Sequence, residues 1–104
     1  MKKKLTNFEI DFLQRLKDPE FSIGLLNEAL KENDKRVFLI VLRDVVEAHG
    51  GMSKFAKLMK ISREHIYRML SSKGNPEFQT LQLLLNALGF KITLEPKEKL
   101  KKAA

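Results

Sequence analysis

Residues 52 to 71 read Met52-Ser-Lys-Phe-Ala-Lys-Leu-Met-Lys-Ile-Ser-Arg-Glu-His-Ile-Tyr-Arg-Met-Leu-Ser71. Apolar residues recur in this stretch at the spacing of two short helices joined by a turn. Those that should face each other are Phe55, Ala56 and Met59 on the first helix and Ile66, Met69 and Leu70 on the second. Ala56 is small, as expected where two steeply crossing helices bring their backbones close together. The pattern predicts a helix-turn-helix, a motif typical of proteins that bind DNA.

Length and composition limit what kind of protein this is. The chain has 104 residues, and we expect a single domain over residues 1–104. It contains no cysteine, which excludes disulfides and thiolate metal sites and fits a reducing cytoplasm. Its longest apolar run, Val37-Phe-Leu-Ile-Val-Leu42, is far shorter than the roughly 20 residues that a bilayer requires. The sequence therefore predicts a cytoplasmic protein with no membrane partner.

Charge is distributed unevenly along the chain, whose formal net charge is +7. Between residues 50 and 75, six basic residues stand against one acidic residue, Glu64. Between residues 18 and 49, seven acidic residues stand against four basic ones. Although any helical surface carries charges for solvation, the basic segment coincides with the predicted helix-turn-helix. We therefore expect this segment to bind a polyanion, double-stranded DNA.

Helix start and stop signals divide the first half of the chain. Residues 1–6 should form a flexible basic N-terminus, and residues 7–49 should be helical. Thr6 or Asn7 can cap a short first helix, and Asp18-Pro-Glu20 starts a second helix that runs to about Glu32. Asn33-Asp34 interrupts the chain before a third helix, residues 35–49, which is predicted to be central and the most buried. Asp34 before this segment and Gly50-Gly51 after it favour a helix over a buried strand.

The second half contains the helix-turn-helix and one further helix, over residues 50–89. Ser53 and Ser62 are predicted to cap the two helices of the motif. A turn at Lys73-Gly-Asn-Pro76 precedes a helix from about Phe78 that ends at Gly89. The expected fold class is therefore all-α, with five to six helices in a helix-turn-helix domain.

The alternating segment Phe90-Lys-Ile-Thr-Leu-Glu95 predicts one short C-terminal β-strand. Because no other segment reads as a strand, its partner should be the same strand of a second chain. Phe90, Ile92 and Leu94 would then form the contact of a homodimer. Residues 96–104 should be a flexible basic tail.

Capping by Ser62 determines which residues of the motif's second helix face outward. Arg63, Glu64, Tyr67 and Arg68 point away from its packed face, and they are the predicted base-reading residues. Arginine pairs with guanine and glutamate accepts from cytosine in the major groove. His65 is expected at the rim. The residues predicted to position DNA phosphates are Ser53, Lys54, Ser62, Lys73 and Asn75.

Enzymatic activity is not expected. The chain has no phosphate-binding glycine loop, no His-Glu-x-x-His pair and no cysteine nucleophile. Of the two histidines, His49 precedes Gly50-Gly51 and is predicted to have a structural role at a helix end. No catalytic site, metal site or cofactor is predicted.

The run from Gly50 to Leu81 contains Ser62-Arg-Glu64, Tyr67-Arg68 and Lys73-Gly-Asn-Pro76. Together with the segments 83–89 and 18–20, it resembles the addiction-module antidote proteins. These are bacterial antitoxins with a phage-repressor-like helix-turn-helix, and the resemblance extends over roughly residues 9 to 95. It implies an antitoxin of a type II toxin–antitoxin module, which binds a small toxin, often a ribonuclease, and represses its own operon as a dimer. The same resemblance implies base contacts at the four residues chosen above.

Lys60 departs from the family pattern, which generally has glycine at this turn. A lysine in the left-handed conformation is disfavoured by roughly 1 kcal/mol.

The acidic first half suggests where a toxin binds. The helices between Pro19 and His49 are predicted to present Glu28 and Glu32 to a basic, ribonuclease-like toxin. The competing interpretation is a stand-alone transcriptional regulator with no toxin partner. A small RNA-binding or membrane-surface protein is less favoured, since no aromatic stacking platform is visible.

Overall fold

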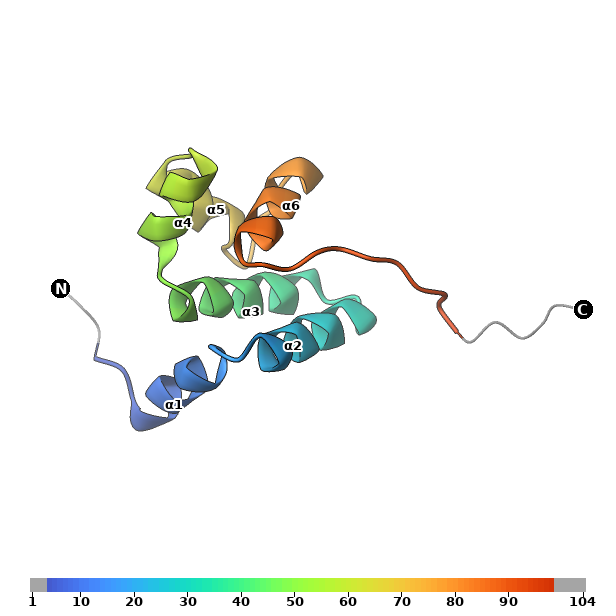
Figure 1. Ribbon diagram of the computed structural model, residues 1–104, viewed down its shortest axis with the longest axis horizontal. Helices are drawn as coiled ribbons and strands as arrows, with labels where there is room; N and C mark the ends of the chain where they lie inside the picture. The colour runs from blue at the N-terminus through green and yellow to red at the C-terminus, as the bar shows by residue number, and fades with distance from the viewer. Residues whose placement is uncertain (1–3, 99–104) are drawn as a thin grey trace, which may run out of the picture.

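The computed structural model describes residues 4–98 and contains six α-helices in that range, with no β-strand (Figure 1). The predicted all-α class with five to six helices is confirmed. Most of the predicted flexible ends, residues 1–3 and 99–104, lies outside the described range. The helices are α1 (Asn7–Arg15), α2 (Pro19–Lys31), α3 (Lys35–Ala48), α4 (Met52–Met59), α5 (Arg63–Met69) and α6 (Phe78–Ala87).

The first three helices begin at the predicted capping residues. The Thr6 hydroxyl accepts from the Glu9 amide at 3.0 Å, while the Glu9 carboxylate accepts from the Thr6 amide at 2.8 Å. Asp18 accepts from the Glu20 amide at 3.1 Å, and Asp34 accepts from the Val37 amide at 3.1 Å. These contacts satisfy amide groups that have no partner within the first turn of a helix. The three helix starts predicted from the sequence are confirmed.

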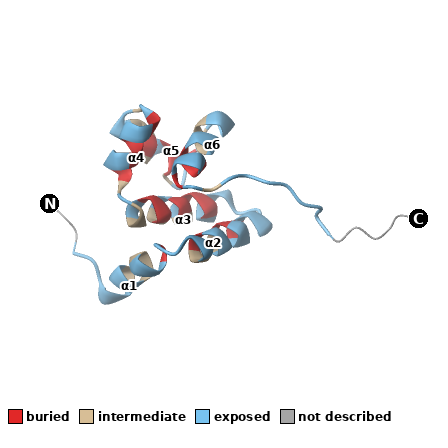
Figure 2. Ribbon diagram, viewed as in Figure 1, coloured by how far each residue is buried: buried red, intermediate tan, exposed pale blue. Residues whose placement is uncertain are grey.

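Helix α3 lies at the centre of the molecule, between α2 on one side and the layer formed by α4, α5 and α6 on the other (Figure 1). Leu42, Val45 and Val46 are fully buried, and α3 carries many of the buried residues in Figure 2. Its first turns are not buried all round, however, since Val37 is 41% and Ile40 is 46% exposed. The apolar run 37–42 does not predict this exposed face, because the burial of a helix depends on which neighbouring helices pack against it.

One carbonyl group joins the three N-terminal helices. The oxygen of Leu16, the residue that ends α1, accepts from the buried Ser22 hydroxyl at 2.7 Å. It also lies 2.9 Å from His49 Nε2, at the end of α3. Because a carbonyl only accepts, His49 donates through Nε2. This contact fits the structural role predicted for His49.

Residues 90–95 do not form the predicted strand. The Phe90 amide donates to the Leu85 carbonyl at 2.8 Å, which closes the end of α6. Beyond it, the backbone groups of residues 91–96 bond to nothing else within residues 4–98, and the segment leads away from the helices (Figure 1). The strand prediction is wrong for the chain by itself, because a strand requires a neighbouring strand and the described part of the chain supplies none. Phe90 is half-buried, whereas Ile92 is 41% and Leu94 is 94% exposed.

Candidate nucleic-acid interface

Helices α4 and α5 pack through the residues predicted from their spacing. All six of these apolar side chains are buried, and Ala56 is only 3% exposed. The connecting turn is residues 60–62, where the Ile61 amide donates to the Ala56 carbonyl at 3.0 Å. The two helices therefore form one rigid unit through Phe55, Ala56, Met59, Ile66, Met69 and Leu70.

The turn between α4 and α5 contains Lys60, the residue that was expected to have an unfavourable backbone conformation. Lys60 has φ 59° and ψ 42°, which is the left-handed helical conformation. In this conformation the Cβ atom lies too close to the following carbonyl oxygen, which destabilises the conformation by about 1–2 kcal/mol. Lys60 therefore has the left-handed backbone conformation that was expected at this turn.

Helix α5 begins at Ser62, as predicted, where the hydroxyl accepts from the His65 amide at 2.9 Å. Arg63 and Glu64 follow directly and are exposed. With Ser62 and Tyr67 they border a shallow depression of about 610 Å³. The structure thus brings together three of the four predicted base-reading residues at the start of α5.

Tyr67 is half-buried and packs against the core, unlike the other predicted base-reading residues. The guanidinium carbon of Arg43 lies 5.4 Å from its ring centre, and that of Arg63 lies 5.7 Å away. Both distances suit a cation–π contact. Arg43 belongs to α3 and was missed by the sequence analysis, because a contact between distant helices leaves no local spacing pattern. Tyr67 therefore connects the exposed start of α5 to the central helix.

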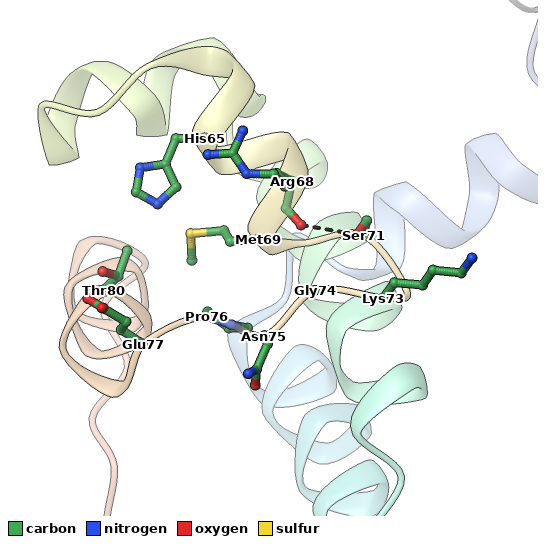
Figure 3. Close-up of a pocket in the computed structure, with 10 residues that line it drawn as sticks. All are labelled: His65, Arg68, Met69, Ser71, Lys73, Gly74, Asn75, Pro76, Glu77 and Thr80. Carbon is green, nitrogen blue, oxygen red and sulfur yellow. Dashed lines mark hydrogen bonds between the residues drawn. The ribbon is translucent and has the colours of Figure 1, made fainter.

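Arg68 lies on a different side of α5, beside a depression of about 530 Å³ between α5, residues 71–77 and α6 (Figure 3). Its side chain extends toward His65, which is half-buried at the rim of this depression. The Arg68 carbonyl accepts from the Ser71 hydroxyl at 3.0 Å, so the loop is tied to the end of α5. Lys73 extends away from Arg68 and His65 in Figure 3, and Asn75 also points away from them. Residues 71–75 of the loop therefore border the depression, while the ends of the Lys73 and Asn75 side chains point away from Arg68.

Two predicted phosphate-positioning residues at α4 have different surroundings. Ser53 is exposed but is not the N-cap, which is Gly51 at φ 99°, with no side-chain hydrogen bond. The capping prediction for Ser53 is wrong, because the helix starts before it at Met52. Lys54 donates from Nζ to the His49 carbonyl at 3.2 Å, and it lies 5.4 Å from the Phe55 ring centre. Lys54 therefore also satisfies a carbonyl group at the end of α3.

The predicted toxin-facing residues lie on α2 and at its end, outside the α4–α5 unit. Glu28 is exposed on α2, and Glu32 is the exposed residue that ends that helix. Figure 1 shows α3 lying between α2 and the α4–α6 layer. Charge reversal at these two positions therefore leaves the surface of α5 untouched.

Among residues 4–98, no three His, Cys, Asp or Glu side chains are grouped so that they can hold a metal ion. Within the same range, no helix has the length and apolar character that crossing a membrane requires.

These features define a small all-helical protein in which a basic two-helix unit, α4 and α5, and an acidic layer, α1 and α2, lie on opposite sides of the central helix α3. Residues 4–96 match the family model described as probable addiction module antidote protein, and the chain belongs to that family. It is also similar to an uncharacterized protein of Haemophilus influenzae, with 33% identity over 87 residues that cover 84% of this chain and 89% of that protein. No solved structure matches the chain. The resemblance seen in the sequence is thereby confirmed at the level of the family.

Proposed function

We propose that this protein is a sequence-specific DNA-binding antitoxin, which neutralises a small partner toxin and represses its own operon. The observation that carries the DNA-binding part is the start of α5. There Ser62 caps a helix whose exposed Arg63 and Glu64 stand on a rigid, basic two-helix unit. The antidote family supports the toxin partner.

In this proposal α5 is the recognition helix and enters the major groove, with α4 lying across the backbone, as in helix-turn-helix proteins. Arg63 and Arg68 donate to guanine O6 and N7, and Glu64 accepts from the cytosine amino group. Tyr67 is held by Arg43 and Arg63, so its ring contributes an apolar or phosphate contact from a fixed position. Specificity therefore comes from exposed side chains on a helix whose register is fixed by its cap.

Five residues around these helices are proposed to contact phosphates. Lys73 extends outward from the loop after α5, which suits contact with a backbone beside the groove. Lys54 keeps donor capacity beyond its bond to His49, because an ammonium group has three hydrogens. Such contacts set the register of the protein on DNA without reading sequence. The set is Ser53, Lys54, Ser62, Lys73 and Asn75.

We propose that the extended segment 90–96 pairs with the same segment of a second chain to form a homodimer. Its backbone donors and acceptors from residue 91 onward are unpaired within the described chain, and Ile92 and Leu94 are exposed. Antiparallel pairing about a two-fold axis would pair the backbone groups of alternate residues and cover these side chains. Sedimentation should show a dimer that Ile92→Asp with Leu94→Asp converts to monomer. A wild-type protein that is monomeric at micromolar concentration would contradict this.

DNA binding is tested by fluorescence titration with the duplex upstream of the protein's own reading frame. An unrelated duplex and single-stranded DNA serve as comparisons, over a series of salt concentrations. We expect tighter binding to the first duplex and a steep loss of affinity with salt. Equal affinity for all three nucleic acids would contradict sequence-specific repression.

The toxin partner is tested with the product of the neighbouring reading frame. We expect the two proteins to co-purify after co-expression, and growth inhibition by that product to be relieved by this chain. A neighbour that neither binds nor inhibits growth would favour the stand-alone regulator.

A further inference from the structure

A groove with a volume of about 1010 Å³ opens between α1, α3 and the end of α5, where Tyr67 and the residues 70–72 border it. Apolar side chains that are exposed to solvent line one part of it. Leu5 is 43%, Phe8 is 77% and Ile40 is 46% exposed. No residue of α1 is buried, so this helix leaves apolar surface uncovered. Exposed apolar groups that line a concave surface are typical of a protein-binding site.

The groove is connected to the core by a row of aromatic rings. Phe8 stacks on Phe12 with ring centres 6.4 Å apart, and Phe12 meets Phe21 edge-on at 6.3 Å. Phe12 and Phe21 are half-buried against the core. The row holds the exposed ring of Phe8 on an ordered support, so a partner that covers it need not first order a flexible side chain.

Acidic side chains line another part of the same groove. Glu9 on α1 and Asp44 and Glu47 on α3 all border it, with Arg43 as the basic residue beside them. Burial raises the pKa of Asp44 above its usual value of 3.8, Arg43 lowers it, and the negative charges of Glu47 and Glu9 raise it further. In a chain with a net charge of +7, this groove carries an excess of negative charge. DNA is therefore excluded as its occupant by charge.

We propose that this groove binds a basic amphipathic segment of the partner toxin. Apolar side chains of that segment would cover Phe8 and Ile40, while its lysine or arginine side chains would pair with Asp44 and Glu47. Charge complementarity favours this occupant over a second copy of the chain, since a two-fold contact would bring the same carboxylates together. The assignment rests on the proposed antitoxin function, and it places the main contact in the groove rather than at Glu28 and Glu32.

The experiment measures binding of full-length variants to the product of the neighbouring reading frame. Phe8→Ala and Glu47→Lys alter the two chemical parts of the groove at exposed positions. We expect each to weaken binding about tenfold, since anchoring side chains at interface centres have effects of this size. The affinity of the wild-type protein should fall with salt more steeply than that of Glu47→Lys.

Matched controls come from the same chain. Ile10 lies on α1, is 47% exposed and does not border the groove, so Ile10→Ala controls for Phe8→Ala. Glu28→Lys with Glu32→Lys controls for charge reversal elsewhere on the acidic layer. Both controls should bind within about twofold of the wild type, as interface rims and outside positions do. The groove variants should keep the operator affinity and the melting temperature of the wild-type protein. Wild-type values would show that these variants are folded.

The possible results distinguish a failure of the groove assignment from a failure of the proposed antitoxin function. If the wild-type protein does not bind the neighbouring product, the antitoxin function and the groove assignment fall together. If the wild type binds and the groove variants bind equally well, only the groove assignment is overturned. Loss of binding in Glu28→Lys with Glu32→Lys alone would move the contact to α2. Conversion of a dimer to a monomer by Phe8→Ala would identify the groove as a contact between copies of this chain, and would also overturn the assignment.

Discussion

The two layers on either side of α3 expose different kinds of side chain. In the α4–α5 unit the facing apolar residues are buried, and the start of α5 presents Arg63 and Glu64 to solvent. On the other side, α1 exposes Phe8, and the adjoining face of α3 exposes Ile40 beside Asp44 and Glu47. A charged surface on a rigid helix suits a polyanion, whereas apolar groups next to charges suit a folded protein. The contrast fits the two binding surfaces proposed above, one for DNA and one for a protein partner.

The largest effect is expected at Gly74, in the loop that ties α5 to α6. A Cβ atom at this position would overlap the Met69 carbonyl oxygen, so the backbone must shift. We expect Gly74→Ala to lower the free energy of unfolding by about 2–3 kcal/mol, measured by urea denaturation.

The control for this variant is Gly24→Ala, which lies in α2 of the acidic layer. An added Cβ at Gly24 meets nothing within 4 Å. Because alanine favours a helix, this change should stabilise the protein by about 0.5–1 kcal/mol. Equal stability of the two variants would show that the loop does not lock α5 in place.

The next largest effect concerns DNA specificity. Arg68→Ala should weaken binding to the operator by about 1–3 kcal/mol and much less to an unrelated duplex, because a base contact is lost. Lys73→Ala should weaken binding to both duplexes alike and reduce the salt slope by about one. Fluorescence titration over a salt series measures both.

Lys31→Ala is the matched control, because it removes an exposed positive charge from α2 in the acidic layer. It should leave the binding of both duplexes unchanged. If it weakened binding as much as Lys73→Ala, overall charge rather than the α4–α5 surface would govern DNA binding. Neither Arg68→Ala nor Lys73→Ala should alter binding of the protein partner.

Each layer also contains one non-glycine residue in the left-handed conformation, Lys60 at φ 59° and Asn33 at φ 55°. Lys60→Gly should raise the free energy of unfolding by about 1 kcal/mol, since glycine adopts this conformation without strain. Asn33→Gly should have a smaller effect, because asparagine already tolerates it. Urea denaturation of both variants measures the difference. No gain for Lys60→Gly would mean that the lysine side chain makes a compensating contact.

Local sequence signals predicted more of the fold than of the binding surfaces. Caps at Thr6, Asp18 and Ser62 depend on neighbouring residues only, so their side chains and spacing suffice. Contacts between distant helices do not have such signals. Arg43 contacts Tyr67 only because α3 and α5 lie next to each other at that point. Ile40 is exposed because α1 borders the groove beside it without covering it. The alternation of residues 90–95 was visible, but whether an extended segment becomes a strand depends on a partner.

The smallest expected effect tests whether the acidic groove destabilises the fold. The raised pKa of Asp44 means that the folded state favours its neutral form, so the carboxylate lowers stability once the pH rises through the folded pKa. Asp44→Asn should therefore stabilise the protein at pH 7, by about 0.5 kcal/mol or less because solvent screens a half-buried group. The difference between the two melting temperatures should shrink as the pH falls toward 3.8. An Asn variant that is less stable at pH 7 would show instead that the pairing with Arg43 outweighs burial. A variant that is more stable but binds the toxin more weakly would indicate that the charge is kept for binding.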